Sequence, residues 1–282
     1  MTALRLVTSN LLNGRSITDG TVNIERMVAS VAALRPTVLA MQEVDRFQSR
    51  SGCVDHTAEI AAAIPNAQWR FVPAIVGEPG VNWRPATPDD PASGHDLAEV
   101  DPSCSAFGTA LVTTLPVLRW QVLRLPPFPR RAPVFIPGGG LLMIDDEPRV
   151  CLAAVVEYGG RPMTVAAAHT SFVPGWNVRH LRRIGHALRG LPAPRFLLGD
   201  LNLPSQFPSR ILRWPQLATG LPTFPAPSPV MQLDHVLLDD PGARFGGVSG
   251  PSGAWRAQAH LLDFSDHRAL SVEYVAQDQP AP

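Results

Sequence analysis

The clearest place for chemistry in this chain is a short apolar run that ends in polar residues. Residues Phe196–Leu198 have the composition of a strand buried on both faces, and after Gly199 come Asp200 and Asn202. The two polar residues stand two positions apart, so in extended geometry both side chains leave the same side of the chain. Open α/β sheets bind ligands at the carboxyl ends of their strands. An isolated Gly-Asp-x-Asn, however, also favours an ordinary turn.

Polar residues follow or begin several other apolar stretches in the same way. These residues are Asn10, Glu43, His169, Asp234, Asp266 and His267. Each has an ordinary alternative when it is taken alone: a turn residue, a surface carboxylate or a hydrogen-bonded histidine. Coincidence at five separate strand ends is much harder to accept, so we interpret the set as one site.

Carboxylates and amides in this set form an all-oxygen group of possible ligands. Hard cations such as Mg²⁺ or Mn²⁺ prefer such ligands, whereas the three cysteines lack the spacing of a zinc site. Mg²⁺ is usually held by one or two carboxylates, so not every acidic residue needs to contact it. Two histidines beside such a cation suit phosphoester hydrolysis, because one imidazole can act as a base and an imidazolium can stabilise charge on phosphorus.

The elements that would position these residues are predicted from hydrophobic periodicity. A strand over 4–9, a helix over 24–34 and a strand over 37–41 imply a right-handed crossover between parallel strands, which places Asn10 and Glu43 at one edge. Further helices are predicted over 55–64 and 176–188, and further strands over 69–75, 106–113, 117–125, 150–158, 163–168, 233–238 and 269–275.

No repeat or linker divides the 282 residues, so we interpret residues 1–282 as a single domain. Residues 77–104 are rich in Gly, Pro, Asp and Ser without apolar periodicity, which predicts a loop insertion that either contacts substrate or is a plain surface loop. Residues 126–133 read as a Pro/Arg-rich connection, followed by a glycine turn at 138–140. We expect the polar tail after residue 276 to fray.

Composition limits the possible functions. The 24 basic residues balance 24 acidic ones, so no global field attracts nucleic acid or an anionic membrane. All the basic residues are arginine, which excludes a lysine nucleophile or Schiff base. No apolar run is long enough to span a bilayer, and the first apolar stretch is too short for a signal peptide. We therefore expect a cytoplasmic protein, and we expect it to be a monomer.

The ordered set of motifs resembles the endonuclease/exonuclease/phosphatase superfamily, to which DNase I and the exonuclease III type of abasic endonuclease belong. The motifs are Asn10 after the first strand, Gln42-Glu43-Val44, His169-Thr170, Gly199-Asp200-Leu201-Asn202, Leu233-Asp234-His235 and Ser265-Asp266-His267. The resemblance spans nearly the whole chain. It implies an α/β fold, namely a four-layer α/β sandwich of two mixed β-sheets packed face to face with helices outside, and metal-dependent phosphoester hydrolysis at the strand ends.

Roles for the metal side of the site follow from the resemblance. It implies that Glu43 is the principal Mg²⁺ ligand, that Asn10 contacts the metal or the phosphate, and that Asp266 lies on the metal side. Mn²⁺ could replace Mg²⁺ there. His169 would donate a hydrogen bond to a phosphate oxygen.

Roles for the water-activating side are implied in the same way. Asp200 would orient or deprotonate the attacking water, and Asn202 would position that water or the phosphate. His267 would be the general base or the charge stabiliser, with Asp234 fixing its tautomer. The division of work between Asp200 and His267 stays open. His235 points to the opposite face of its strand and is expected to be structural.

The substrate is the open part of this prediction. The leading hypothesis is a phosphodiesterase or nuclease, with a phosphatase or a lipid phosphodiesterase of the inositol phosphate or sphingomyelin type as the alternative, or a catalytically silent binding module. Balanced charge disfavours strong non-specific DNA binding, although the arginine-rich helix 179–189 could be either a phosphate-binding patch or a solvated face. Candidates for contact with DNA are Arg46, Trp83 and Arg84, and an apolar loop around 128–135 could contact lipid.

Overall fold

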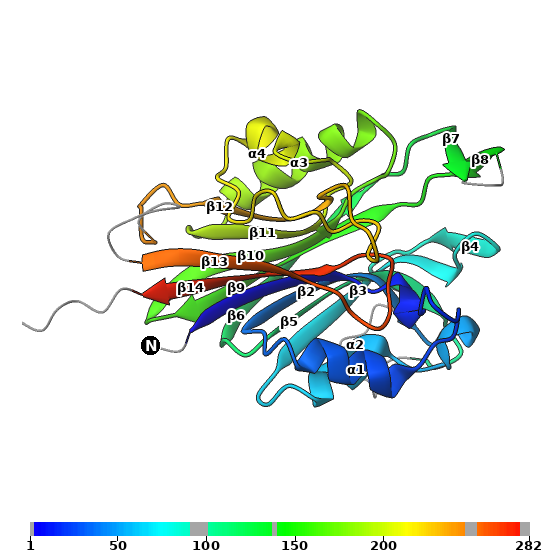
Figure 1. The fold of residues 1–282 in the computed structure, drawn as a ribbon, viewed down its shortest axis with the longest axis horizontal. Helices are drawn as coiled ribbons and strands as arrows, with labels where there is room; N and C mark the ends of the chain where they lie inside the picture. Colours follow the sequence, from blue (N-terminus) through cyan, green and yellow to red (C-terminus); the bar gives the residue numbers. More distant parts are fainter. Residues whose placement is uncertain (1–2, 91–100, 137–139, 246–252, 277–282) are drawn as a thin grey trace, which may run out of the picture.

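A computed structural model describes residues 3–90, 101–136, 140–245 and 253–276. Two large sheets lie face to face (Figure 1). The first sheet has the strand order β13 (Gly253–His260), β14 (Ala269–Ala276), β1 (Leu4–Asn10), β2 (Val38–Arg46), β5 (Ala106–Thr113), β3 (Gln68–Glu78) and β4 (Asn82–Pro85). The second has the order β12 (Asp234–Asp239), β11 (Arg195–Asp200), β10 (Arg161–His169), β9 (Arg149–Tyr158) and β6 (Val117–Leu125).

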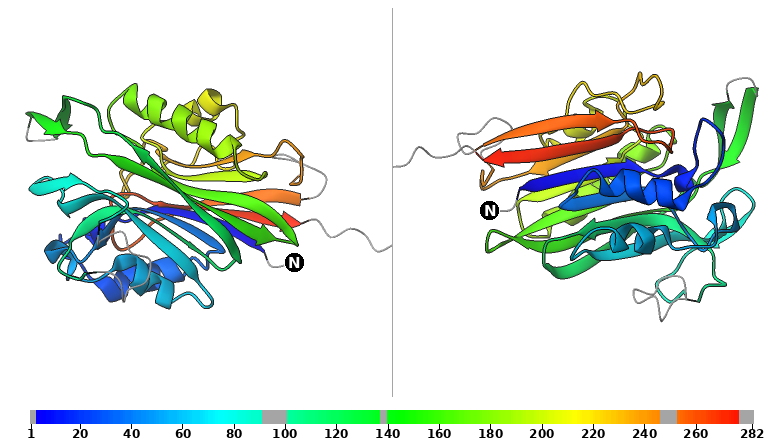
Figure 2. Two further views of the ribbon diagram at one scale, coloured as in Figure 1. Left: turned by 180° about the vertical axis from the view of Figure 1, so that it is seen from behind. Right: turned by 60° about the horizontal axis from the view of Figure 1, so that its bottom comes forward.

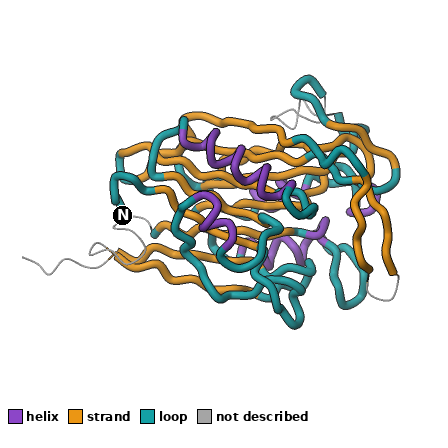
Figure 3. The backbone as a smooth tube through the Cα atoms, turned by 90° about the horizontal axis from the view of Figure 1, so that it is seen from above, coloured by secondary structure: helices purple, strands orange, loops and turns teal. Residues whose placement is uncertain are grey.

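Helices cover the outer faces of both sheets. In Figure 1, α1 (Ile24–Ala32) and α2 (His56–Ala62) lie below the first sheet, and α3 (Trp176–Arg189) and α4 (Phe207–Leu212) lie above the second. The view from above shows the helices lying over the strands (Figure 3). Parallel and antiparallel pairs occur in both sheets. The predicted four-layer sandwich of two mixed sheets is therefore confirmed.

Because side chains alternate along the strands, three apolar clusters form between the four layers of helices and sheets. In β1, Leu6 packs between the two sheets, whereas Val7 packs in the cluster that contains Met27 of α1. In β11, Leu198 packs between the sheets and Leu197 packs in the cluster under α3. Because both faces of these strands are covered, their sequences are continuous apolar runs rather than alternating ones.

Strand direction gathers the polar residues at one end of the sandwich. The parallel pair β1 and β2 places Asn10 beside Gln42, as the predicted crossover requires. The parallel pair β10 and β11 places His169 beside Asp200, and the antiparallel partner β12 begins with Asp234 opposite Asp200. These strand ends meet at the end of the molecule away from the N-terminus (Figure 1).

Several elements differ from the prediction. The Pro/Arg-rich connection expected over 126–133 runs into β7 (Arg131–Ile136), which pairs with β8 (Gly140–Asp145) in a hairpin that stands away from both sheets (Figure 2). Most of the expected glycine turn at 138–140 falls on residues 137–139, which lie outside the described residues. The predicted loop 77–104 is wrong at its start, where β3 and β4 form a hairpin; residues 91–100 and the tail after 276 lie outside the described residues. Short strands that pair mainly with each other carry little periodicity to detect.

Two further elements were not predicted from periodicity. The edge strand β13 alternates apolar residues such as Trp255 and Ala257 with polar ones, which is a period-two signal too weak in apolar content to stand out. Helix α4 has six residues and begins with a proline near its first position, so it contains too few turns for a helical pattern.

Gly199 is required by the close approach of β10. Its φ is +152°, and a Cβ at this position would overlap the backbone oxygen of Ala168. Because the obstacle is backbone within a paired sheet, it cannot move aside. We expect Gly199→Ala to lower the free energy of unfolding by at least about 4 kcal/mol in a urea titration.

A matched glycine separates this collision from ordinary backbone strain. Gly160, in the β9–β10 turn, has φ +69° and no atom within 4 Å of the place where a Cβ would lie. Gly160→Ala should therefore cost only about 1–2 kcal/mol, the penalty for a left-handed residue. Equal losses in the two variants would contradict the argument.

Candidate active site

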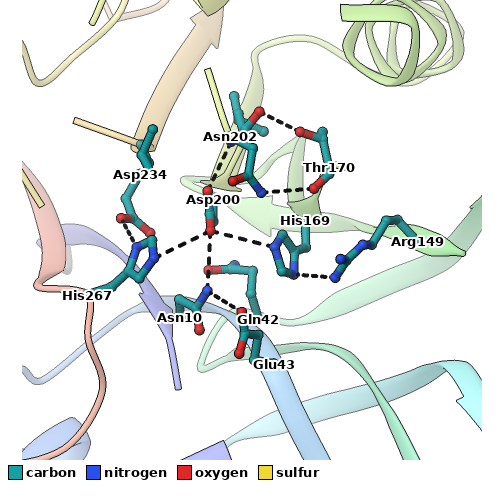
Figure 4. A network of polar contacts seen from close by, with 12 residues as sticks. Asn10, Gln42, Glu43, Arg149, His169, Thr170, Asp200, Asn202, Asp234 and His267 are labelled. Carbon is teal, nitrogen blue, oxygen red and sulfur yellow. Dashed lines mark hydrogen bonds and ion pairs between the residues drawn. The ribbon is translucent and has the colours of Figure 1, made fainter. Parts of the chain in front are cut away.

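Figure 4 shows the polar cluster between the two sheets. It contains predicted residues from both sheets and from the loop before β14: Asn10, Glu43, His169, Asp200, Asn202, Asp234 and His267. Asp266, the remaining predicted residue, adjoins His267 in the chain and is close enough to Glu43 to interact with it electrostatically. The structure thus brings seven of the eight predicted residues into one set of contacts, with Asp266 next to it in the chain.

Strand alternation explains why most of these side chains face the gap between the sheets. Asp200 has the same orientation as Leu198, which packs between the sheets. The same rule relates each of three other pairs: Asn10 to Leu6, His169 to Ala167, and Asp234 to Val236. His235 has the opposite orientation, and its Nε2 lies 2.8 Å from the backbone oxygen of Leu203, which supports the structural role expected for it.

Glu43 breaks this alternation. Leu39 and Met41 pack toward the helices, and regular extension would turn Glu43 the same way. Instead, the register between β2 and β5 shifts between Met41 and Val44, and Glu43 adopts a φ of +54°. The extra residue turns the carboxylate to the site, where Oε1 accepts a hydrogen bond from Asn10 Nδ2 at 3.0 Å. Bulges and left-handed non-glycine residues of this kind concentrate at functional sites.

The Asp200 carboxylate lies at the centre of the cluster. Its Oδ1 accepts a hydrogen bond from the backbone N–H of Asn202 at 3.0 Å. Its Oδ2 accepts from Asn10 Nδ2 at 3.2 Å and lies 3.6 Å from Nε2 of His169 and 3.8 Å from Nε2 of His267. Burial raises the pKa of Asp200, although the charge of His267 opposes that shift. The carboxylate is therefore more basic than an exposed one.

Carboxylates surround His267. Its Nδ1 lies 2.8 Å from Oδ2 of Asp234, which is fully buried, and the Phe224 ring packs 4.9 Å from its ring. Burial lowers the pKa of His267, but the carboxylates of Asp234, Asp200 and Asp266 together raise it to about 10. At neutral pH this side chain is therefore an imidazolium.

His169 has a cation as its neighbour instead. Nη1 of Arg149 lies 3.2 Å from its Nδ1. Burial, and then the charge of Arg149, hold the pKa of His169 well below the usual value. Arg149 was not among the predicted residues because an arginine that begins a strand is ordinary. The signal that could have found it is topological: β9 is antiparallel to β10, so β9 begins where β10 ends at His169.

The donors on the metal side suit a hard divalent cation. Burial, and repulsion from Asp266, raise the pKa of Glu43, and burial raises that of Asp266. A bound cation would neutralise both carboxylates and so remove the cause of the two raised pKa values. Among the described residues no group of three or more His, Cys, Asp or Glu side chains could hold a metal by itself, so two carboxylates would be completed by water and substrate oxygens, as is usual for Mg²⁺. Asn10 Oδ1 accepts from the Leu12 N–H at 3.0 Å, and its role as a direct ligand stays a prediction.

Asn202 is held rigidly beside Asp200. It adopts a φ of +48°, and its Nδ2 donates to the backbone oxygen of Thr170 at 3.0 Å. Asn177 of α3 in turn donates to the backbone oxygen of Asn202 at 2.8 Å. These contacts fix the turn that follows β11, so Asn202 positions Asp200 through its N–H.

The residues proposed for contact with DNA lie in other settings. Arg46 is fully buried and its Nε lies 2.7 Å from Oδ2 of Asp55. The prediction that Arg46 contacts DNA is therefore wrong, because its side chain does not reach the surface. Arg84 pairs with Asp90 on the β4 hairpin. On α3, Arg179 is exposed and stacks 4.6 Å from the Trp176 ring.

Comparisons with known proteins agree with this geometry. Residues 7–267 match the sequence model of the Endonuclease/Exonuclease/phosphatase family. Among solved structures, an endonuclease/exonuclease/phosphatase from Beutenbergia cavernae has a TM-score of 0.61 at 19% identity, covering 99% of this chain and 73% of that one. A mannosyl-6-phosphatase from Bacteroides thetaiotaomicron has a TM-score of 0.60 at 13% identity, covering 96% and 99%.

The catalytic domain of human Nocturnin, solved with a bound sulfate anion, has a TM-score of 0.55 at 15% identity and covers 98% of this chain and 95% of that one. At such identities the likeness shows the fold alone. None of the curated proteins matches the chain in sequence. Within the described part of the chain, no helix is long and apolar enough to cross a membrane.

Proposed function

The chain belongs to the endonuclease/exonuclease/phosphatase family, and we propose that it hydrolyses phosphoesters with a divalent cation, Mg²⁺ or Mn²⁺. The observation that carries this proposal is the environment of Asp200. One buried carboxylate lies between the Nε2 atoms of His169 and His267, at 3.6 and 3.8 Å, and a second acidic side chain, Glu43, lies nearby with a raised pKa. Titratable groups whose pKa values are shifted by burial and by specific charged neighbours concentrate at functional sites.

A cation held by Glu43 and Asp266 would polarise a phosphoryl oxygen and neutralise charge on the phosphate. Side chains of the protein would activate the attacking water. Asp200 orients the attacking water and accepts its proton, because burial raises the pKa of this carboxylate toward the range of a useful base. The Asn202 N–H fixes Oδ1, which leaves Oδ2 to face the water.

His267 acts as the charge stabiliser in this proposal. Its pKa of about 10 makes it a cation at neutral pH, so it cannot first accept a proton from water. Its Nδ1–H donates to Asp234, which leaves the Nε2–H free to donate to a phosphoryl or leaving-group oxygen. Asp200 can accept a proton whereas His267 already carries one, which supports Asp200 as the base.

A phosphodiesterase or nuclease is the leading subclass. A phosphatase is the second candidate, favoured by the likeness to a mannosyl-6-phosphatase and by the balanced charge, which gives no global attraction for a polyanion. The substrate panel below also tests two other candidates, a lipid phosphodiesterase and a catalytically silent binding module of the same fold. We expect the protein to act as a cytoplasmic monomer.

A substrate panel tests the reaction class. Purified protein would be assayed with Mg²⁺, Mn²⁺ or excess chelator on plasmid DNA, single-stranded DNA, RNA, abasic duplex, bis-p-nitrophenyl phosphate, a sugar phosphate, inositol phosphates and sphingomyelin. Metal-dependent release from one class supports the proposal and names the substrate. Hydrolysis that is unaffected by the chelator would contradict the metal role, and no hydrolysis of any substrate would favour the binding module.

Cation binding can be measured without a substrate. We expect Mg²⁺ at a hundred times its dissociation constant to stabilise the protein by about 2.7 kcal/mol in thermal unfolding. Because burial raises the pKa of Glu43, the carboxylate must lose a proton before it binds the cation, so the Mg²⁺ effect should shrink as the pH falls toward that raised pKa, at higher pH than for an exposed glutamate.

Matched variants test the location of this cation. Glu43→Gln should abolish the Mg²⁺ shift, whereas Glu25→Gln, which changes an exposed glutamate of α1, should leave it intact. A full Mg²⁺ shift in Glu43→Gln would place the cation elsewhere.

A further inference from the structure

The two histidines beside Asp200 have opposite neighbours. His267 has the carboxylate of Asp234 at its Nδ1, 2.8 Å away. His169 has the guanidinium of Arg149 at the same ring atom, 3.2 Å away. Both rings direct Nε2 toward one oxygen, Oδ2 of Asp200. Figure 4 shows this chain of contacts from Arg149 through His169 to Asp200.

Hydrogen-bond chemistry fixes the proton on His169. A guanidinium has only N–H donors and keeps its charge at all accessible pH values. Its contact with Nδ1 therefore requires a lone pair on Nδ1, and the single proton of the neutral ring must be on Nε2. Protonation of Nδ1 would bring two donors face to face at a buried site, where unpaired polar groups are costly.

We propose that Arg149 is a positioning residue that holds His169 as the neutral Nε2–H tautomer, so that His169 donates one hydrogen bond and transfers no proton during turnover. The catalytic consequence rests on the proposed function, but the tautomer does not. His169 then has one task, that of a fixed neutral donor.

The surroundings of both side chains agree with this assignment. Arg149 is 8% exposed and begins β9, whose backbone pairing fixes its position. Besides Arg149, the groups that face His169 are His267, His180 and the carboxylate of Asp200. Burial and the charge of Arg149 lower the pKa of His169, as a permanently neutral ring requires.

Among the described residues, no ion pair shorter than 3.9 Å holds Arg149 in place. Its Nη1 lies 3.9 Å from Glu147, too far for a strong hydrogen bond, so the His169 ring is its nearest polar partner through that atom. The contact is therefore more than a by-product of a tight ion pair elsewhere.

Nitrogen NMR of the metal-free, isotope-labelled full-length protein tests the tautomer directly, with His169→Gln identifying the resonances. In the wild type, we expect Nε2 to carry the proton and Nδ1 to be unprotonated, with no titration across the neutral range. Arg149→Met should produce a mixture of tautomers, Arg149→Lys should retain Nε2–H, and Arg149→Glu should move the proton to Nδ1.

Arg195→Met is the matched control, since Arg195 also forms a half-buried polar contact, with Asp239 at 2.7 Å, in the same sheet. It should leave the His169 resonances unchanged. A wild-type His169 with its proton on Nδ1, a doubly protonated ring at neutral pH, or an unchanged tautomer in Arg149→Met would each overturn the proposal. The Arg149→Lys variant keeps the test valid if Arg149→Met fails to fold.

Kinetics supply the second measurement. Arg149→Met should lower kcat about 10- to 100-fold, the usual effect of losing a residue that orients a catalytic side chain, and Arg149→Lys should restore part of it. If the wild type hydrolyses no phosphoester, the proposed function fails while the NMR result still decides the tautomer. Full activity in Arg149→Met despite a changed tautomer would overturn the catalytic consequence.

Discussion

Replacing Glu43 by glutamine is expected to lower metal-dependent phosphoester hydrolysis by at least about a thousandfold, which corresponds to about 4 kcal/mol of lost transition-state stabilisation. Glu43 is the half-buried carboxylate turned into the site by the β2 bulge, with Asp266 as the second carboxylate proposed to hold the cation. The glutamine keeps the shape and the contact with Asn10 but removes the charge that the cation needs.

The same variant should be at least as stable as the wild type without metal. Burial raises the pKa of Glu43, which means that the charged form is unfavourable in the folded protein. Thermal unfolding in chelator and kcat for the best panel substrate would be measured together, with Glu25→Gln on the surface of α1 as the control. Turnover near the wild-type rate in Glu43→Gln would overturn the site assignment.

The second large effect concerns His267. Replacement of His267 by glutamine should reduce kcat by about 10²- to 10⁴-fold, the usual range for loss of a group that donates a proton or hydrogen bond in the transition state. The reason is the loss of a cation next to Asp200, where Nε2 lies 3.8 Å from Oδ2. His260→Gln, which removes a histidine bonded to Ser271 away from the site, should have no such effect.

Asp234→Asn tests the charge of His267 through the pH dependence of the rate. His267 must be protonated to act, and its pKa is about 10, so the wild-type rate should fall only as the pH rises toward that value. Asp234 is the carboxylate that raises this pKa most, so its neutral analogue should move the basic limb of the pH–rate profile to lower pH. A basic limb in the same place would show that another group controls it.

Local patterns predicted where many of these side chains lie. The apolar runs before Asn10 and Asp200 are buried strands, and the parallel pairing of β1 with β2 follows from the strand-helix-strand order. Alternation within a strand depends only on backbone geometry, so residues two positions after a core leucine or alanine face the same gap. For Asp200 and His169 this rule was sufficient.

The orientation of the Glu43 side chain cannot be predicted from the residues around it in the sequence. Alternation alone would direct it to the helices, and only the bulge between Met41 and Val44 turns it to Asn10. A bulge depends on how β2 pairs with β5, more than 60 residues later in the chain, so no window around Glu43 contains the cause.

Arg46 and Arg149 complete the contrast. The sequence presents two ordinary arginines at the ends of strands, but packing buries Arg46 against Asp55 and places Arg149 against His169. The sequence by itself determined the buried strands and the types of side chain at their ends, because these depend on short-range periodicity, and the resemblance of its ordered motifs to a known family implied the layered fold. Only the tertiary structure decided which charges meet, and therefore which histidine is a cation and which is neutral, because those contacts join residues distant in the chain.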